Sequence, residues 1–142
     1  MPLVDLYATS CQWIPAGEKP WLGLLFFLFA SFFNGLVIEI GRKLRRSENE
    51  EEGVPTYSKL WGLKTAVWVW FGALIMTALF AIFAAHYINA TFLTFISLSS
   101  LLIGALILSS QSQWYREKRF EIFSAIWTLT LYLNLGIIPS FA

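Results

Sequence analysis

Cysteine, histidine and formal charge are all scarce in this chain of 142 residues. Its one cysteine, Cys11, cannot form a disulfide within the chain, which excludes a disulfide-stapled fold. The chain has one histidine, His86, and its sequence contains no zinc-ligand spacing. It also contains no nucleophile-elbow motif and no phosphate-binding glycine loop. Charged residues make up 13% of the chain, against roughly 25% in soluble domains. The net charge of +1 gives no basis for binding nucleic acid through bulk electrostatics.

Apolar residues are abundant instead, and they fall into four long runs. Hydrophobic residues make up 57% of the chain, and the runs cover residues 21–40, 63–85, 90–108 and 122–138. Each run is close to the roughly 20 residues that cross a bilayer as a helix. In lipid the backbone must satisfy its own hydrogen bonds, which favours helices. The sequence therefore predicts an all-α, polytopic transmembrane helical bundle of about four spans over residues 21–142.

Residues 1–20 are too short and interrupted for a further span. Pro15, Gly17 and Pro20 are typical of a connection between elements. Two interpretations stay open: an N-terminal connection, or the end of a helix that starts earlier.

Basic residues predict the orientation of these spans. Residues 41–62 contain five of them and residues 109–120 contain three, whereas the turn "HYIN" after the second span contains no lysine or arginine. Cytoplasmic loops carry an excess of Lys and Arg. We expect an integral membrane protein of the bacterial inner membrane, with loops 41–62 and 109–120 in the cytoplasm.

The most charged stretch, residues 39–62, reads "EIGRKLRRSENEEEGVPTYSKLWG". Glu39 ends the first span, on a helix predicted to continue to Arg46. Lys43 follows one helical turn later, so the two side chains can neutralise each other. Asn34 is deeper in the span and needs a polar partner, either a neighbouring helix or a cavity open to the cytoplasm.

An acidic run at residues 50–52 precedes "GVPT" in the same stretch. Adjacent carboxylates suit Mg²⁺, which takes one or two carboxylates together with a substrate phosphate. The alternative is an ordinary solvated charge run. Gly53 permits a tight turn, and Thr56 is placed to cap a helix that begins near Tyr57. Basic residues could meet a diphosphate, but the same residues already account for the topology.

The order of these features resembles the second aspartate-rich region of the UbiA-type intramembrane prenyltransferase superfamily. In that family an Asp-x-x-x-Asp pattern precedes Gly-x-x-Thr before the next helix. The chain has "NGLVIEIGRK" and then "EEGVPTYSKLWG", with glutamates in place of aspartates. The arrangement of helix, cytoplasmic loop, helix and two further spans is similar to the last four helices of that nine-helix fold.

The resemblance implies roles for particular residues. Glu39 matches the first acid of the motif, whereas Lys43 stands where the family has its second acid. Glu51 and Glu52 would replace the missing ligand, so the implied set for a Mg²⁺ cofactor is Glu39, Glu51 and Glu52. The implied diphosphate-binding residues are Arg42, Lys43 and Lys59, and Asn34 would be a polar cavity residue.

By resemblance, the function is that of the C-terminal half of a membrane prenyltransferase. The whole enzyme would transfer a prenyl group from an allylic diphosphate to an aromatic or lipid-like acceptor. This half, which lacks the family's first acidic motif, is expected to be inactive alone, and to associate with an N-terminal half or with itself. The alternative is a non-catalytic membrane subunit or assembly factor. A small transporter is a weaker third interpretation because charges within the spans are scarce.

Overall fold

The computed structural model describes residues 2–44, 52–53, 57–110 and 117–137. The described residues form helices joined by turns and short connections, and they contain no strand, which confirms the predicted all-α class. The helices are α1 (Pro2–Trp13), α2 (Leu22–Arg42), α3 (Tyr57–Trp61), α4 (Leu63–Tyr87), α5 (Thr91–Ser110) and α6 (Glu117–Gly136).

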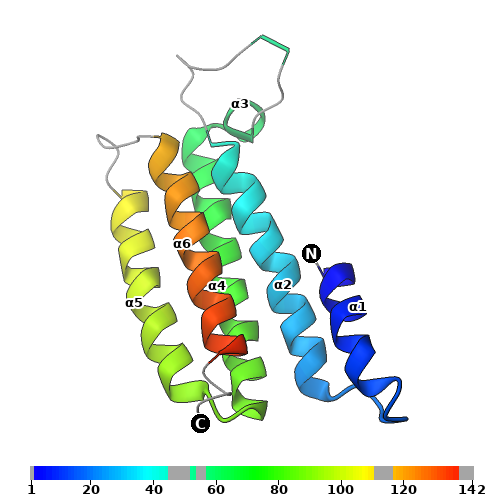
Figure 1. The fold of residues 1–142 in the computed structure, drawn as a ribbon. Helices are drawn as coiled ribbons and strands as arrows, with labels where there is room; N and C mark the ends of the chain where they lie inside the picture. Colours follow the sequence, from blue (N-terminus) through cyan, green and yellow to red (C-terminus); the bar gives the residue numbers. More distant parts are fainter. Residues whose placement is uncertain (1, 45–51, 54–56, 111–116, 138–142) are drawn as a thin grey trace.

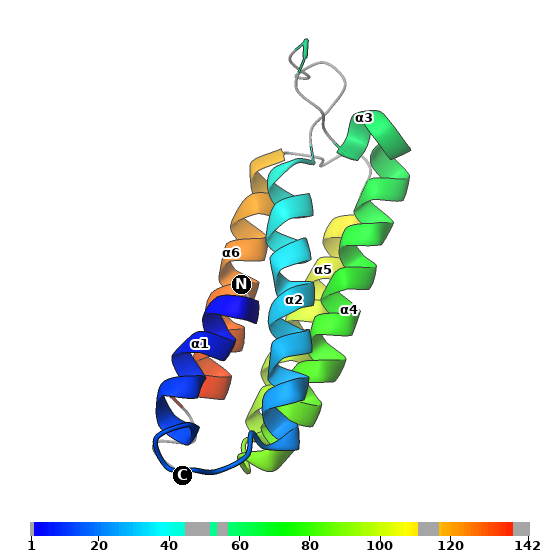
Figure 2. The same cartoon turned by 90° about the vertical axis from the view of Figure 1, so that its right-hand side faces the viewer.

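Four long helices form the body of the protein (Figures 1 and 2). Helix α2 packs against α4 and α6, and α5 packs against the same two helices. The end of α2, the start of α4, the end of α5 and the start of α6 lie at one end of this bundle, together with α3 (Figure 1). The two predicted cytoplasmic loops are therefore at the same end, which is the arrangement that the basic residues predicted.

Three of the helices that the structure describes are long and apolar enough to cross a membrane: α2, α4 and α5. Among the described helices, α6 does not qualify, although it has 20 residues. Its first turns carry Glu117, Lys118, Arg119 and Glu121, which raise its polarity. The prediction of about four spans thus exceeds the three that the structure shows. The predicted fourth run lies in the later turns of α6, and its last residue, 138, is outside the described residues.

Small side chains on α4 permit close packing of the helices. Fully buried alanines recur along it, including Ala66 and Ala81, and small residues of this kind let helix backbones approach in membranes. Large buried side chains fill the centre, with Trp70 and Trp127 both at 0% exposure. In contrast, Phe92 on α5 is 75% exposed, as expected for a side chain that faces lipid.

Ser124 joins three helices close to the charged loop. The indole Nε1–H of Trp70 on α4 donates to Ser124 Oγ on α6 at 3.0 Å. Ser124 Oγ also lies 2.7 Å from its acceptor, the carbonyl oxygen of Phe120. Gly41 of α2 lies against the same group: a Cβ there would overlap Ser124 Oγ and lie 3.1 Å from Trp70 Nε1. The absence of a side chain at Gly41 is therefore what allows α2 and α6 to meet here.

The turn between α4 and α5 is short and closed by its own backbone. The N–H groups of Ile88 and Ala90 both donate to the Ala85 carbonyl oxygen, at 3.2 and 3.0 Å. Asn89 between them has a φ of 56°, a left-handed conformation that asparagine tolerates better than most residues.

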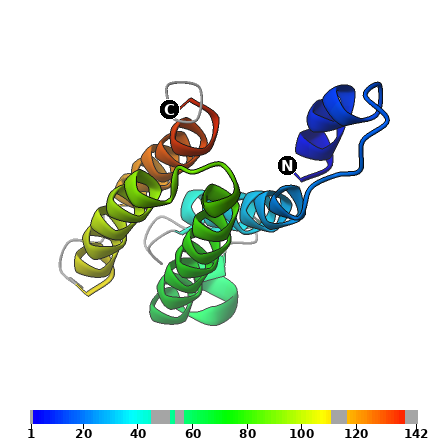
Figure 3. The ribbon, with the colours of Figure 1, turned by 90° about the horizontal axis from the view of Figure 1, so that it is seen from below.

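The structure shows a helix within residues 1–20, where the sequence left two interpretations open, and it differs from one expectation about helix bounds. Residues 2–13 form helix α1, which lies outside the bundle beside the first half of α2 (Figures 1 and 3). The predicted extension of the first span to Arg46 is wrong, because α2 ends at Arg42. Lys43 is its C-cap, with its N–H bonded to the carbonyl oxygens of Glu39 and Ile40. Residues 45 and 46 are outside the described ranges.

Candidate functional site

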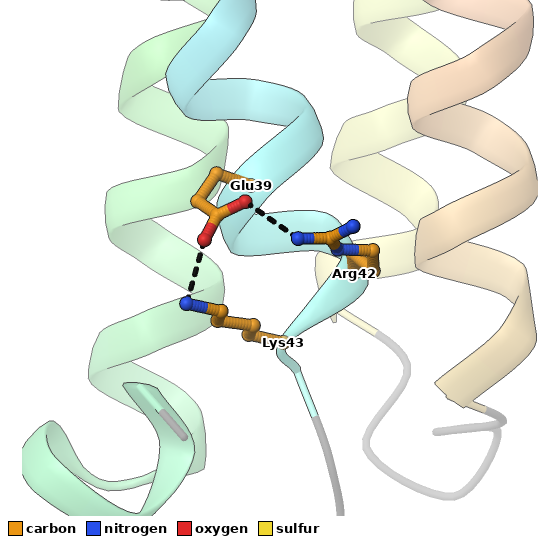
Figure 4. A network of polar contacts seen from close by, with 3 residues as sticks. All are labelled: Glu39, Arg42 and Lys43. Atoms are coloured by element: carbon orange, nitrogen blue, oxygen red, sulfur yellow. Dashed lines mark hydrogen bonds and ion pairs between the residues drawn. The ribbon is translucent and has the colours of Figure 1, made fainter. Parts of the chain in front are cut away.

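Glu39 is held between two cations of its own helix (Figure 4). Lys43 Nζ lies 2.6 Å from Glu39 Oε1, and Arg42 Nη2 lies 3.0 Å from Glu39 Oε2. The spacings of three and four residues place these side chains on one face of α2. The pairing of Glu39 with Lys43, one of the two interpretations of the sequence, is thus present. The Glu39 side chain keeps 37% exposure, so ligands in solution can still reach it.

The other predicted ligands belong to the connection between α2 and α4. Glu52 is exposed in a turn with Gly53, whose φ of 89° agrees with the tight turn predicted there. Lys59 is exposed on α3, at the same end of the bundle as Glu39. Glu51, Glu50 and Thr56 lie outside the described residues. The predicted helix near Tyr57 is present as α3.

The metal ligands inferred by resemblance do not come together in the described part of the chain. No three side chains of His, Cys, Asp or Glu converge there on a point that could hold a metal ion. Both carboxylate oxygens of Glu39 already contact cations. The described residues therefore do not fit a Mg²⁺ site by themselves, and a metal would depend on carboxylates of the loop.

Asn34 is fully buried where α2 meets α6. Its Oδ1 accepts a hydrogen bond from Thr128 Oγ1 at 3.2 Å. The sequence left two possible partners for Asn34, a neighbouring helix or a cavity. The partner of Oδ1 belongs to a neighbouring helix, α6. The Nδ2 group is also buried, and no hydrogen-bond partner from the described residues reaches it. A buried amide donor left unpaired costs about 1–3 kcal/mol, so this position is a polar defect within the bundle.

A groove of about 460 Å³ runs along the boundary of α2 and α6. Arg42 and Glu121 line it at the charged end, and the hydroxyl-bearing residues Ser124, Thr128 and Tyr132 follow at successive turns of α6. Sequence reasoning missed this row. Its signal was the spacing of four residues between the hydroxyls, which places them on one helix face.

Sequence reasoning also missed a polar contact made by the N-terminal segment. The Ser31 hydroxyl on α2 donates to the Asp5 carboxylate on α1, and Ser31 Oγ lies 3.2 Å from Tyr132 Oη on α6. An acid in the otherwise apolar stretch "PLVDLY" was the available signal.

Comparison of the chain with protein-family profiles, with curated proteins and with solved structures finds no match in any of the three. The assignment of a function therefore depends on the residues and their geometry.

Proposed function

We propose that this chain is the C-terminal half of a UbiA-like membrane prenyltransferase. The observation that carries the proposal is the end of α2, where Glu39, Arg42 and Lys43 cluster beside a groove that leads along α6. The resemblance of the residues around this cluster to the family's second acidic region gives the cluster its proposed role. The later turns of α6 would then serve as a fourth span.

The proposed chemistry is a substitution at an allylic carbon. The carbon–oxygen bond to diphosphate breaks, the acceptor forms a new bond to that carbon, and the acceptor loses a proton. Arg42, Lys43 and Lys59 would offset the negative charge that develops on the departing diphosphate. The apolar walls of the bundle would limit the access of water to the allylic cation. Because the described residues do not fit a Mg²⁺ site, none of these steps is assigned to a metal.

Ligand protection of the charged loop tests this proposal. We expect an allylic diphosphate to slow proteolysis between residues 43 and 62, since anion binding would immobilise the loop. The variant with both Arg42→Gln and Lys43→Gln should lose this protection, and Lys19→Gln at the opposite end should retain it. If Glu51 and Glu52 recruit Mg²⁺, the metal should deepen the protection in the native chain and not in a variant with both glutamates replaced by alanine.

The matching prenyl alcohol, which lacks the diphosphate, is the ligand control. Equal protection by the alcohol, or equal protection of the native chain and the arginine–lysine variant, would contradict diphosphate binding at this cluster.

A non-catalytic membrane subunit is the second candidate function. One observation favours it: Glu39 is already paired by Arg42 and Lys43, so the cluster is satisfied without a ligand. The outer face of α1 is also apolar and exposed, with Leu3 at 80% and Tyr7 at 74%, which suits contact with lipid or another membrane protein.

Membrane orientation gives a separate prediction. In a Cys11→Ser background, we expect Glu52→Cys to react with an impermeant thiol reagent only from the cytoplasmic side. Glu18→Cys, exposed in the α1–α2 connection at the other end of the bundle, should react only from outside. The basis is the excess of lysine and arginine in the two loops at the Glu52 end. Labelling of Glu52→Cys from outside would reverse the orientation.

A further inference from the structure

A carboxylate lies beside the middle of helix α2. Asp5 belongs to the first turn of α1, and its Oδ2 accepts the hydroxyl of Ser31. Ser31 is 1% exposed and stands near the midpoint of α2, a helix of 21 residues that is apolar enough to cross a membrane. Figures 1 and 2 show α1 starting beside the middle of α2 and running toward the end where α2 begins. Asp5 is therefore placed at the depth of the hydrocarbon.

Such a position is costly for a charged side chain unless polar partners replace the water that it loses. Ionisable side chains at membrane depth face polar partners and mark functional sites. The Ser31 hydroxyl donates to Asp5, and Tyr132 Oη lies 3.2 Å from Ser31 Oγ. A carboxylate can accept about four hydrogen bonds. Within the described ranges, Oδ2 receives one donor and Oδ1 receives none.

A cavity of about 490 Å³ lies directly beside this polar group. Its walls come from α1, α2, α4 and α6, and Tyr132 belongs both to the wall and to the polar group. Thr9 on α1 and Phe27 on α2 also line the cavity. Asp5 and Ser31 are each one helical turn beyond these two residues, away from the end of the bundle. The carboxylate thus stands one turn deeper than the cavity wall.

The lining of the cavity as a whole is largely apolar and aromatic. It includes Trp21, Leu24, Phe27, Tyr87 and Leu135, together with the polar side chains of Thr9 and Gln12. Ligand sites in proteins commonly have volumes of about 300–1,000 Å³, with mostly apolar walls and a few convergent polar groups. The cavity has both properties.

We propose that this cavity binds a lipid-soluble molecule that carries a hydrogen-bond donor, a hydroxyl or a protonated amine, directed at Asp5. The apolar body would pack between Leu24, Phe27 and Leu135, and the donor would extend one helical turn beyond the cavity wall to Oδ1 of the Asp5 carboxylate. A molecule with an anionic head would be repelled by the same carboxylate. The inference does not depend on prenyl transfer, because the site lies in the opposite half of the bundle from Glu39.

Photolabelling of the whole chain in detergent tests the site. The probes are a long-chain primary amine, the alcohol and the carboxylic acid of equal length, each with a diazirine near the polar head. We expect the amine or the alcohol to label peptides from residues 2–13, 22–42 and 117–136, and the acid to label them weakly. Loss of a hydrogen bond to a charged group lowers binding affinity roughly tenfold. Asp5→Asn should therefore lower labelling by the amine about tenfold at subsaturating probe.

Matched variants separate specific binding from partitioning into the apolar surface. Glu18→Gln removes an acid at the same end of the bundle and should leave labelling unchanged. Leu24→Trp should block labelling by filling the cavity while the polar group is kept, and near-ultraviolet circular dichroism confirms that each variant is folded. The proposal is overturned if Asp5→Asn and Leu24→Trp label like the native chain, or if the acid labels as well as the amine. Labelling spread evenly over the outer face of α5 would also overturn it.

Discussion

The purified chain, supplied with Mg²⁺, farnesyl or geranylgeranyl diphosphate and a panel of acceptors, is expected to form no prenylated product. Co-expression with an N-terminal half of a UbiA-like enzyme should restore transfer. Positioning two substrates together contributes about 7–11 kcal/mol to lowering a barrier. One half of a chamber, the role proposed for this chain, would supply only part of this positioning. It would also admit water, which would capture the allylic cation before the acceptor does.

Product analysis by mass spectrometry distinguishes the possible outcomes. Hydrolysis to the free prenyl alcohol by the chain alone would agree with an open half-site. Rapid transfer by the chain alone would exclude the half-enzyme proposal. If neither preparation forms product, a non-catalytic membrane subunit becomes the better account. The paired Arg42→Gln and Lys43→Gln variant, co-expressed in the same way, controls for activity from the added half.

Gly41→Ala is expected to destabilise the bundle by about 1–3 kcal/mol, the usual cost of forcing extra methyl groups into a packed interior. The new Cβ would overlap Ser124 Oγ and lie 3.2 Å from the carbonyl oxygen of Phe120, a backbone atom that cannot rotate away. Helices α2 and α6 would have to separate, or Ser124 would have to move from its present position against Trp70. The measurement is the midpoint of unfolding in a mixed-micelle denaturant titration.

Gly72→Ala is the matched control. It makes the same change on α4, where no atom of the described part of the chain lies within 4 Å of the added atom. Alanine is better than glycine in a helix interior by about 0.5–1 kcal/mol, so this variant should be neutral or slightly more stable. Equal midpoints for the two variants would show that the close approach at Gly41 does not limit packing.

The features that the sequence predicted are those that depend on neighbouring residues. The apolar runs of α2, α4 and α5 are continuous in the chain, so their helices followed from the length and apolar composition of each run. The pairing of Glu39 with Lys43 followed from a spacing of four residues. In contrast, the extension to Arg46 was wrong. Charged residues are compatible with a helix, and the sequence carried no breaker to mark its end at Arg42.

The polar group at Asp5 could not be predicted in the same way. Ser31 is 26 residues from Asp5 in the chain and Tyr132 is 101 residues from Ser31, so only tertiary packing brings the three together. The prolines and glycine that follow α1 made residues 1–20 resemble a simple connection. Those residues do lie in the connection that returns α1 against α2, with a φ of 67° at Gly17, but residues 2–13 before them are helical. The sequence showed that Asn34 needs a polar partner. That this partner is Thr128 depends on which face of α6 is turned toward α2.

The closed turn at Ile88–Ala90 has a consequence for how the protein enters the membrane. Residues 65–110, which comprise nearly all of α4, the turn and α5, contain no Asp, Glu, Lys or Arg. Each such charge at the centre of a spanning helix opposes insertion by about 2.5–3.5 kcal/mol, and this segment avoids that cost. Its two helices can meet as soon as both leave the ribosome, because loop closure over so few residues is entropically cheap. We therefore expect α4 and α5 to insert as one hairpin, which then provides the surface on which α2 and α6 assemble.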